Sequence, residues 1–163
     1  MKYSFRFLLA AAVSVLTMAA CQRTAAPGPI KVDVPQRPAG QENVLNLVTP
    51  PMDTVRIGLV GLGSRGSGAV SRLTYVPGCR IAAICDVEKE NVDAARKILS
   101  GRGYSEVPAY YGDTLAFRQL CERDDIDLVY ICTDWIHHTP IALYAMEHGK
   151  NAAIEVPAAR SEE

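Results

Sequence analysis

The pattern of apolar and polar positions changes at Val55. From there on, short apolar runs alternate with amphipathic stretches. The run LVYIC at residues 128–132 is apolar almost throughout, which is typical of a strand buried on both faces of a parallel sheet. We predict five strands, at residues 55–60, 80–85, 107–111, 128–132 and 151–154, of which the third has the weakest pattern.

The stretches between these strands carry helix signals. Val92, Ala95 and Leu99 share one face of a predicted helix, which ends near Gly101 and Gly103. Strand and helix alternate along the whole region. This order predicts an α/β fold with a doubly wound parallel sheet.

Polar residues mark the starts of the two later helices. Asp113 is placed to cap a short helix, and Thr139 is placed to cap the next one. Pro140 suits the first turn of that helix, and Gly149 lies just past its end. The apolar face of the short helix would hold Phe117, Leu120 and Cys121.

The N-terminus reads as an export signal. Lys2 and Arg6 precede an uncharged run at residues 7–20, which as a helix extends about 21 Å and is shorter than a bilayer core of about 30 Å. We therefore predict a signal peptide at residues 1–20. Small residues before Cys21 resemble a bacterial lipobox, in which Cys21 is lipidated and anchors the protein in the cell envelope. The alternative is an ordinary signal peptide followed by an unrelated cysteine.

Residues 22–53 contain six of the ten prolines and show little periodicity. They predict an extended tether between the lipid anchor and a folded domain at residues 54–163. The chain stops where a strand ends and a helix begins, so we expect it to be a truncated part of a longer protein.

Composition excludes two classes of protein. With 48% hydrophobic and 21% charged residues, the chain is too apolar to be disordered. Its 17 basic and 18 acidic side chains exclude a nucleic-acid binder that works through a basic field. Cys85 and Cys132 lie in apolar runs without a Cys-x-x-Cys pattern, so we predict buried thiols rather than a metal site, although exported proteins also form disulfides.

The sequence GLGSRG at residues 61–66 follows a predicted strand and opens a predicted helix. In this context Gly61 would form a tight turn, Gly63 would let a pyrophosphate approach, and Gly66 would let the helix pack closely. Arg65 would add a charged donor beside the free N–H groups of the helix.

Asp86 ends the second predicted strand, 20 residues after Gly66. An acidic residue at this place accepts hydrogen bonds from ribose hydroxyls and repels a 2′-phosphate, which predicts NAD rather than NADP as the cofactor. The alternative is a glycine-rich turn with an unrelated aspartate.

Two further groups follow later strands at the same edge of the sheet. Trp135 lies in a predicted loop, where its ring would pack on a nicotinamide or a sugar, or would anchor the loop in the core. His137 and His138 point in two directions, so they would not share a metal, and one of them would cap the following helix. Glu155 ends the fifth strand beside the cofactor cleft, or is simply an exposed strand end.

Together these residues resemble the Gfo/Idh/MocA oxidoreductase family over about residues 54–159, and more specifically its branch called glycosyl hydrolase family 109. Val156 stands where the wider family has the lysine of Glu-Lys-Pro, as in that branch. The resemblance implies that Ser64 and Arg65 hold NAD together with Asp86. It also implies a lining of the nicotinamide half by Trp135, Ile136, His137, His138, Glu155 and Val156.

The resemblance further implies an NAD-dependent α-N-acetylgalactosaminidase that acts on terminal N-acetylgalactosamine. Hydride transfer from C3 of the sugar, elimination at C1 and addition of water would be followed by return of the hydride, so that NAD is recycled. Its catalytic residues and its C-terminal α/β domain would lie beyond residue 163, so we expect the 163-residue chain alone to be inactive. The alternatives are an exported sugar oxidoreductase and an inactive NAD-binding module, and the oligomeric state stays open.

Overall fold

The computed structural model describes residue 28, residues 39–40 and residues 46–159. The predicted signal peptide, the predicted lipidation site Cys21 and most of the predicted tether lie outside the described residues. Every helix and strand that the structure describes falls within the unit Thr49–Glu163. In the part of the chain that the structure describes, no helix is both long and apolar enough to cross a membrane.

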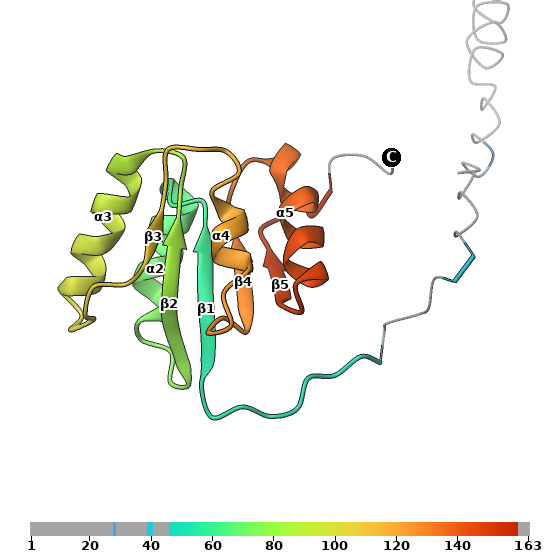
Figure 1. Cartoon of the computed structure of the whole chain (residues 1–163), viewed down its shortest axis with the longest axis horizontal. Helices are drawn as coiled ribbons and strands as arrows, with labels where there is room; N and C mark the ends of the chain where they lie inside the picture. Colours follow the sequence, from blue (N-terminus) through green and yellow to red (C-terminus); the bar gives the residue numbers. More distant parts are fainter. Residues whose placement is uncertain (1–27, 29–38, 41–45, 160–163) are drawn as a thin grey trace, which may run out of the picture. The chain divides into compact units, whose positions relative to one another are not determined.

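Five parallel strands form one sheet, as predicted from the apolar runs (Figure 1). Strands pair in the order β3-β2-β1-β4-β5. β2 and β3 therefore lie on one side of β1, and the chain then crosses back so that β4 pairs with the other side of β1. The third strand is shorter than predicted, with two residues in place of five. The strands are β1 (Val55–Val60), β2 (Cys79–Cys85), β3 (Ala109–Tyr110), β4 (Leu128–Ile131) and β5 (Asn151–Ile154).

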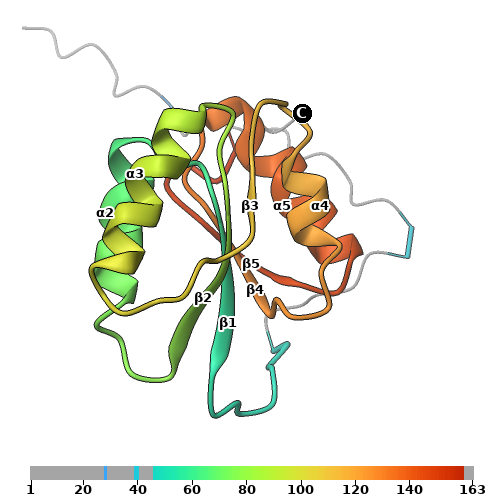
Figure 2. The same ribbon diagram turned by 60° about the vertical axis from the view of Figure 1, so that its left-hand side comes forward.

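Four helices cover the sheet in two layers, which Figure 2 separates clearly. α2 (Ser64–Leu73) and α3 (Lys89–Ser100) pack on one face, whereas α4 (Phe117–Cys121) and α5 (Trp135–Glu147) pack on the other. The central strand β1 is buried on both sides because each face has its own apolar cluster. This double burial explains why the strands read as continuous apolar runs.

The start of α5 differs from the prediction. The helix begins at Trp135, and the carboxylate of Asp134 caps it by accepting from the backbone N–H groups of Ile136 and His137, each at 3.1 Å. Thr139 is therefore not the cap, and Pro140 lies inside the helix. Asp134 lies five residues before Thr139 and offers the same cap chemistry, so the helix begins earlier than predicted.

Of two other predicted helix ends, the one at Gly149 is confirmed and the one at Asp113 is not. Gly149 follows α5 with a φ of +75°, and the backbone N–H of Lys150 reaches back to the carbonyl oxygen of Ala145 at 2.9 Å, as in a glycine-terminated helix end. Asp113 caps a turn rather than a helix. Its carboxylate accepts from the backbone N–H of Leu115 at 2.9 Å, and α4 begins only at Phe117.

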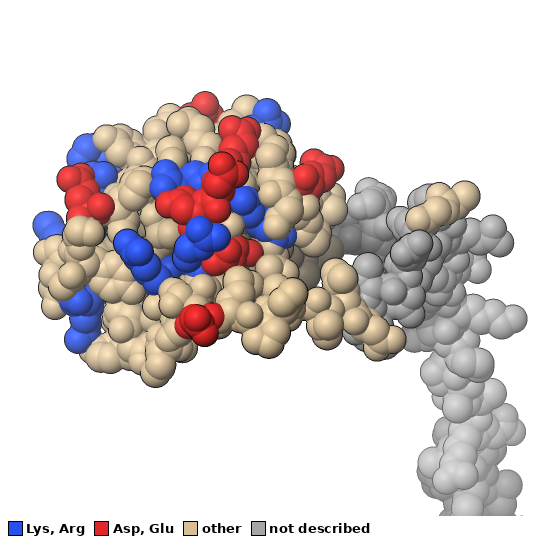
Figure 3. Space-filling model, turned by 60° about the horizontal axis from the view of Figure 1, so that its bottom comes forward, with Lys and Arg blue, Asp and Glu red and all other residues tan. Residues whose placement is uncertain are grey.

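The two edges of the sheet differ in character. Acidic and basic side chains are interspersed at the amino edge, which faces the viewer in Figure 3. Arg56 and Asp127 form an ion pair of 2.6 Å there, beside a second pair between Arg123 and Asp125. The carboxyl edge instead gathers the loops that follow β1, β2 and β4, which is where open α/β sheets bind their ligands.

Candidate cofactor site

The glycine loop after β1 depends on missing side chains at two positions. Gly61 has a φ of +87°, and a β-carbon there would lie 2.7 Å from the carbonyl carbon of Cys132. A β-carbon on Gly66 would overlap the carbonyl oxygen of Gly61, so the helix packs against the loop as predicted. Gly63 is the N-cap of α2 and faces open space. A ligand can therefore approach the backbone at Gly63 and the first turn of α2.

Asp86 connects this loop to the end of β2. Its Oδ2 accepts a hydrogen bond from the backbone N–H of Leu62 at 2.5 Å. Its Oδ1 accepts from the backbone N–H of Glu88 at 2.8 Å and from the side-chain amide of Asn91 at 3.1 Å. The residue is only 8% exposed. A carboxylate offers about four acceptor positions, so most of its capacity is already used within the protein.

A cavity of about 470 Å³ opens beside Asp86 at the carboxyl edge. Gly61, Gly63, Asp86 and His137 line it, in agreement with their predicted place at one site. The carboxylates of Glu88, Asp113 and Asp134 line it as well, and within the described part of the chain no lysine or arginine does. An acidic lining favours hydroxyl and amino donors and disfavours phosphate.

The cavity also includes residues that the sequence pattern did not single out for a site. They include Val87, Glu88, Asn91, Asp113, Thr114, Phe117 and Ile141. Most of them come from the segment after β2 and from the turn before α4. Only the fold brings these segments together, because the strand order places β3 and β4 on either side of β2 and β1. Asn91 had one available signal, its place in the first turn of the helix that follows Asp86.

His137 and Asp134 form a pair at the mouth of the cavity. His137 Nδ1 lies 2.7 Å from Asp134 Oδ1, and this hydrogen bond lowers the pKa of the Asp134 carboxyl below its usual value. Both side chains are about half exposed or more and line the cavity. The pair leaves Nε2 of His137 free to meet a ligand.

His138 has a different environment. It is 1% exposed and lies between two carbonyl oxygens, with Nδ1 2.8 Å from that of Pro157 and Nε2 3.0 Å from that of Thr133. The two histidines thus point in two directions, as predicted, but neither caps a helix at Pro140. His138 links the segment after β5 to the segment after β4 rather than lining the cavity.

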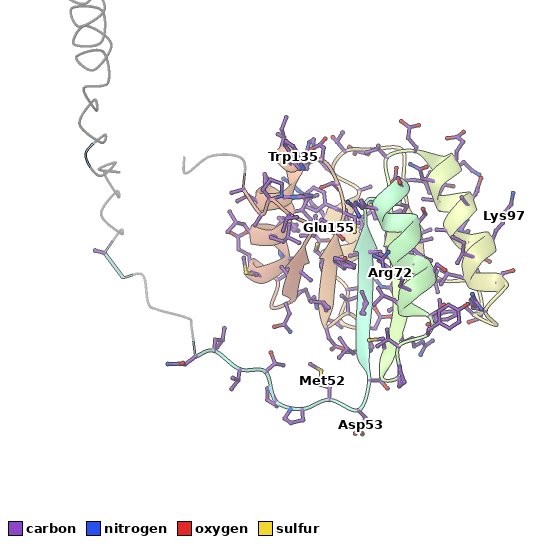
Figure 4. All side chains as sticks on the ribbon, turned by 180° about the vertical axis from the view of Figure 1, so that it is seen from behind. Met52, Asp53, Arg72, Lys97, Trp135 and Glu155 are labelled. Carbon is purple, nitrogen blue, oxygen red and sulfur yellow. The ribbon has the colours of Figure 1, made fainter. Side chains whose placement is uncertain are left out.

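Trp135 and Ile136 begin α5 rather than lying in a loop, which corrects the prediction for residues 135–138. They are 60% and 61% exposed, so Trp135 does not anchor this region in the core. Figure 4 shows Trp135 at the carboxyl edge, pointing away from the sheet. Neither residue lines the cavity, and both form an exposed apolar rim beside it.

Glu155 is held by a neighbouring strand. The hydroxyl of Tyr130 donates a hydrogen bond of 2.6 Å to its Oε1, and this bond raises the pKa of Tyr130 to about 12. Figure 4 places Glu155 on the same face of the sheet as Arg72 of α2. Val156 is 84% exposed. Glu155 and Val156 therefore lie at the predicted edge but outside the cavity that contains Asp86.

The remaining predicted residues frame the loop. Ser64 and Arg65 are exposed at the start of α2, next to the open side of Gly63.

The cysteines were predicted to be buried thiols. Cys85 and Cys132 are buried and line the cavity, and burial raises their pKa values to about 12 and about 11. The four cysteines that the structure describes are unpaired. Among the described residues, no group of three His, Cys, Asp or Glu side chains is placed to hold a metal.

The comparison with known families identifies this region. Residues 55–163 match the family GFO_IDH_MocA, described as "Oxidoreductase family, NAD-binding Rossmann fold". The chain is 57% identical over 133 residues to "Glycosyl hydrolase family 109 protein 1" of Phocaeicola vulgatus, covering 82% of this chain and 28% of that protein. A protein of the same name from Bacteroides thetaiotaomicron is 57% identical over 131 residues, again 28% of its length. The chain thus spans little more than a quarter of the relatives it matches.

Solved structures share the fold. The myo-inositol dehydrogenase from Lactobacillus casei, in complex with NAD(H) and myo-inositol, is 26% identical with a TM-score of 0.55, over 65% of this chain and 29% of that chain. The apo scyllo-inositol dehydrogenase from the same organism is 25% identical with a TM-score of 0.57, over 67% of this chain and 30% of that chain. Both dehydrogenases are longer chains that contain a domain like this one.

Proposed function

The chain belongs to the Gfo/Idh/MocA oxidoreductase family and carries its NAD-binding Rossmann domain, and from this premise we propose that it holds NAD for a glycoside hydrolase. The substrate class that we propose is terminal α-N-acetylgalactosamine. The relatives named glycosyl hydrolase family 109 support the hydrolase, and the departure at Val156 supports the same branch. The whole activity would require the remainder of a longer protein.

The residues present fit the dinucleotide. The free N–H groups at the start of α2 and the open backbone at Gly63 suit a pyrophosphate, to which Ser64 and Arg65 would add side-chain donors. The acidic cavity beside Asp86 suits the adenosine ribose, whose hydroxyls are hydrogen-bond donors. Carboxylates around Asp86 would repel the 2′-phosphate of NADP. The observation that carries the proposal is this open, acidic cavity next to the glycine loop.

The nicotinamide half would lie along the other loops of the same edge. Trp135, Ile136 and Val156 present exposed apolar surface there, and Glu155 is oriented by Tyr130. His137 would contact the dinucleotide from the mouth of the cavity, whereas His138 would act by holding the segment at Pro157 in place.

Bound NAD would supply reversible hydride acceptance at C3 of the sugar, which permits elimination and addition of water at C1 without net redox change. A cofactor that is regenerated in each turnover suits the predicted export of the chain, because no second substrate is needed to reoxidise it. The side chains of this domain would bind and orient the dinucleotide. We assign no catalytic residue to it.

Titration of the 163-residue chain with NAD and NADP tests cofactor binding. Trp135 is the only tryptophan of the chain and is exposed beside the site, so its fluorescence reports binding. We expect saturable quenching by NAD and much weaker binding of NADP. Equal binding of both dinucleotides, or of neither, would contradict the assignment.

The reaction is tested on the whole protein that contains this domain. We expect release of p-nitrophenol from an α-N-acetylgalactosaminide by the whole protein and none by the 163-residue chain. The second candidate is a sugar oxidoreductase, which the likeness to myo-inositol dehydrogenase favours. Net conversion of NAD to NADH with a sugar or inositol, without p-nitrophenol release, would select that candidate.

A further inference from the structure

Asn91 occupies a particular place between α3 and the cavity. Its side-chain amide donates to Asp86 Oδ1 at 3.1 Å, and the residue itself lines the cavity. The side chain is therefore in contact both with the proposed ribose-binding carboxylate and with the space that a ribose would enter.

The hydrogen-bond capacity of Asp86 limits what it can do alone. Donors from Leu62, Glu88 and Asn91 fill three of about four acceptor positions on its carboxylate. A ribose presents two neighbouring hydroxyls. Asp86 can accept one of them without losing a bond within the protein, and the second hydroxyl requires another partner.

Asn91 can supply that partner. Its amide keeps a carbonyl oxygen and a second N–H, and within the described residues its only hydrogen bond is the one to Asp86. A carbonyl oxygen accepts from a hydroxyl, and an N–H donates to one. Both groups belong to a side chain that borders the cavity.

A purely local role in α3 does not account for this arrangement. A polar side chain at the third position of a helix can cap it by bonding the backbone N–H of the residue before the helix. In α3 that residue is Glu88, and its N–H is already bonded to Asp86 Oδ1 at 2.8 Å. The side chain of Asn91 is thus directed to Asp86 and not to the helix end.

We propose that Asn91 and Asp86 together bind the 2′,3′-diol of the adenosine ribose, with Asn91 contacting one hydroxyl and positioning the carboxylate for the other. This inference rests on the proposed binding of NAD. It makes Asn91 a second determinant of cofactor affinity and of the preference for an unmodified ribose.

The test compares NAD with its 2′-deoxy and 3′-deoxy analogues in the adenosine ribose, on the 163-residue chain. We expect the native chain to bind NAD more tightly than both analogues. The measure is the ratio of the Kd of each analogue to the Kd of NAD. In Asn91→Ala this ratio should fall by about threefold to tenfold for at least one analogue, which corresponds to the loss of one hydrogen bond. Asn151→Ala is the matched control. It removes an amide that donates to the carbonyl oxygen of Asp127 at the opposite edge of the sheet, and it should change nothing.

A second variant keeps the size of the side chain. Asn91→Asp places an acidic residue in the first turn of α3, which stabilises a helix, but sets a second carboxylate against Asp86. At pH 8 we expect NAD to bind at least tenfold more weakly than to the native chain.

Two results would overturn the inference by itself. One is that Asn91→Ala weakens NAD and both analogues by the same factor, as a merely structural role would. The other is that Asn91→Asp binds NAD at pH 8 as tightly as the native chain does. A native chain that does not bind NAD at all would instead overturn the proposed function, and this inference with it.

Discussion

The backbone N–H of Leu62 donates a 2.5 Å hydrogen bond to Oδ2 of Asp86, which lies 24 residues further along the chain. This bond connects the glycine loop after β1 to the end of β2 across the carboxyl edge of the sheet. Asp86 therefore holds the shape of the loop as well as facing the cavity. Its structural role and its proposed binding role can each be measured in the same variant.

Replacing Asp86 by alanine should lower both stability and NAD affinity. The change leaves the buried N–H of Leu62 without its acceptor, which costs about 1–3 kcal/mol in the free energy of unfolding. Urea denaturation measures that loss, and fluorescence titration measures binding. Asp93→Ala on the exposed side of α3 is the control and should leave both nearly unchanged. An unaltered urea midpoint in Asp86→Ala would show that the bond does not stabilise the loop.

The two glycines Gly66 and Gly63 should respond differently to alanine. In Gly66→Ala the new methyl group overlaps the carbonyl oxygen of Gly61, so we expect a loss of about 1–3 kcal/mol or more in stability. In Gly63→Ala the methyl group enters open space, so stability should fall by about 1 kcal/mol or less. NAD binding should nevertheless weaken, because the methyl group stands where the pyrophosphate would approach. Thermal unfolding and NAD titration of both variants check this order, and the reverse order of stabilities would refute it.

The ion pair of Arg56 and Asp127 should make stability depend on acid pH. Hydrogen bonds from Arg56 lower the pKa of Asp127 to about 2, whereas an unfolded aspartate titrates near 4. A lowered pKa in the folded state contributes stability above about pH 4, and this contribution is lost as the pH falls toward 2. Urea midpoints measured from pH 5 to pH 2 should therefore fall less steeply in Asp127→Asn than in the native chain. Parallel curves would show that the pair contributes nothing.

The hydrogen bond between Tyr130 and Glu155 should be visible in a tyrosine titration. The acceptor raises the pKa of Tyr130 to about 12, so Glu155→Gln should return that pKa toward its usual value near 10. Carbon NMR of labelled tyrosine rings resolves the change. Tyr144, whose hydroxyl bonds to Glu122, serves as the internal control and should titrate alike in both proteins.

Cys21 should attach the protein to a membrane after export. We expect incorporation of labelled palmitate and recovery in the membrane fraction when the chain is expressed in a bacterium. Cys21→Ser should abolish both, whereas Cys79→Ser in the folded domain should affect neither. Labelling that persists in Cys21→Ser would place the lipid elsewhere, and its absence from the native chain would favour an ordinary signal peptide.

Local patterns in the sequence determined the elements of the sheet. Strands β1 and β5 occupy the predicted residues, and β2 and β4 differ by one residue at one end. For β1, β2 and β4 the predictions succeed because strands packed under apolar clusters carry runs of apolar residues, which a short window of sequence reveals. The glycine loop was predictable for a similar reason. Gly61 adopts a positive φ, and a side chain on Gly66 would overlap the backbone of Gly61, so both requirements arise within a few residues of sequence.

The tertiary structure alone decided which side chains meet at the site. Leu62 contacts Asp86, and Tyr130 contacts Glu155, across pairs of neighbouring strands, so these contacts depend on strand order and register. His138 likewise bridges Thr133 and Pro157, which follow the neighbouring strands β4 and β5. No local periodicity encodes those quantities. The same reason separates His137, which lines the cavity, from the buried His138, although the two are adjacent in sequence. The sequence thus determined the strands and the loop, whereas packing between distant segments determined the bond of Asp86 to Leu62 and the cavity that Asn91 borders.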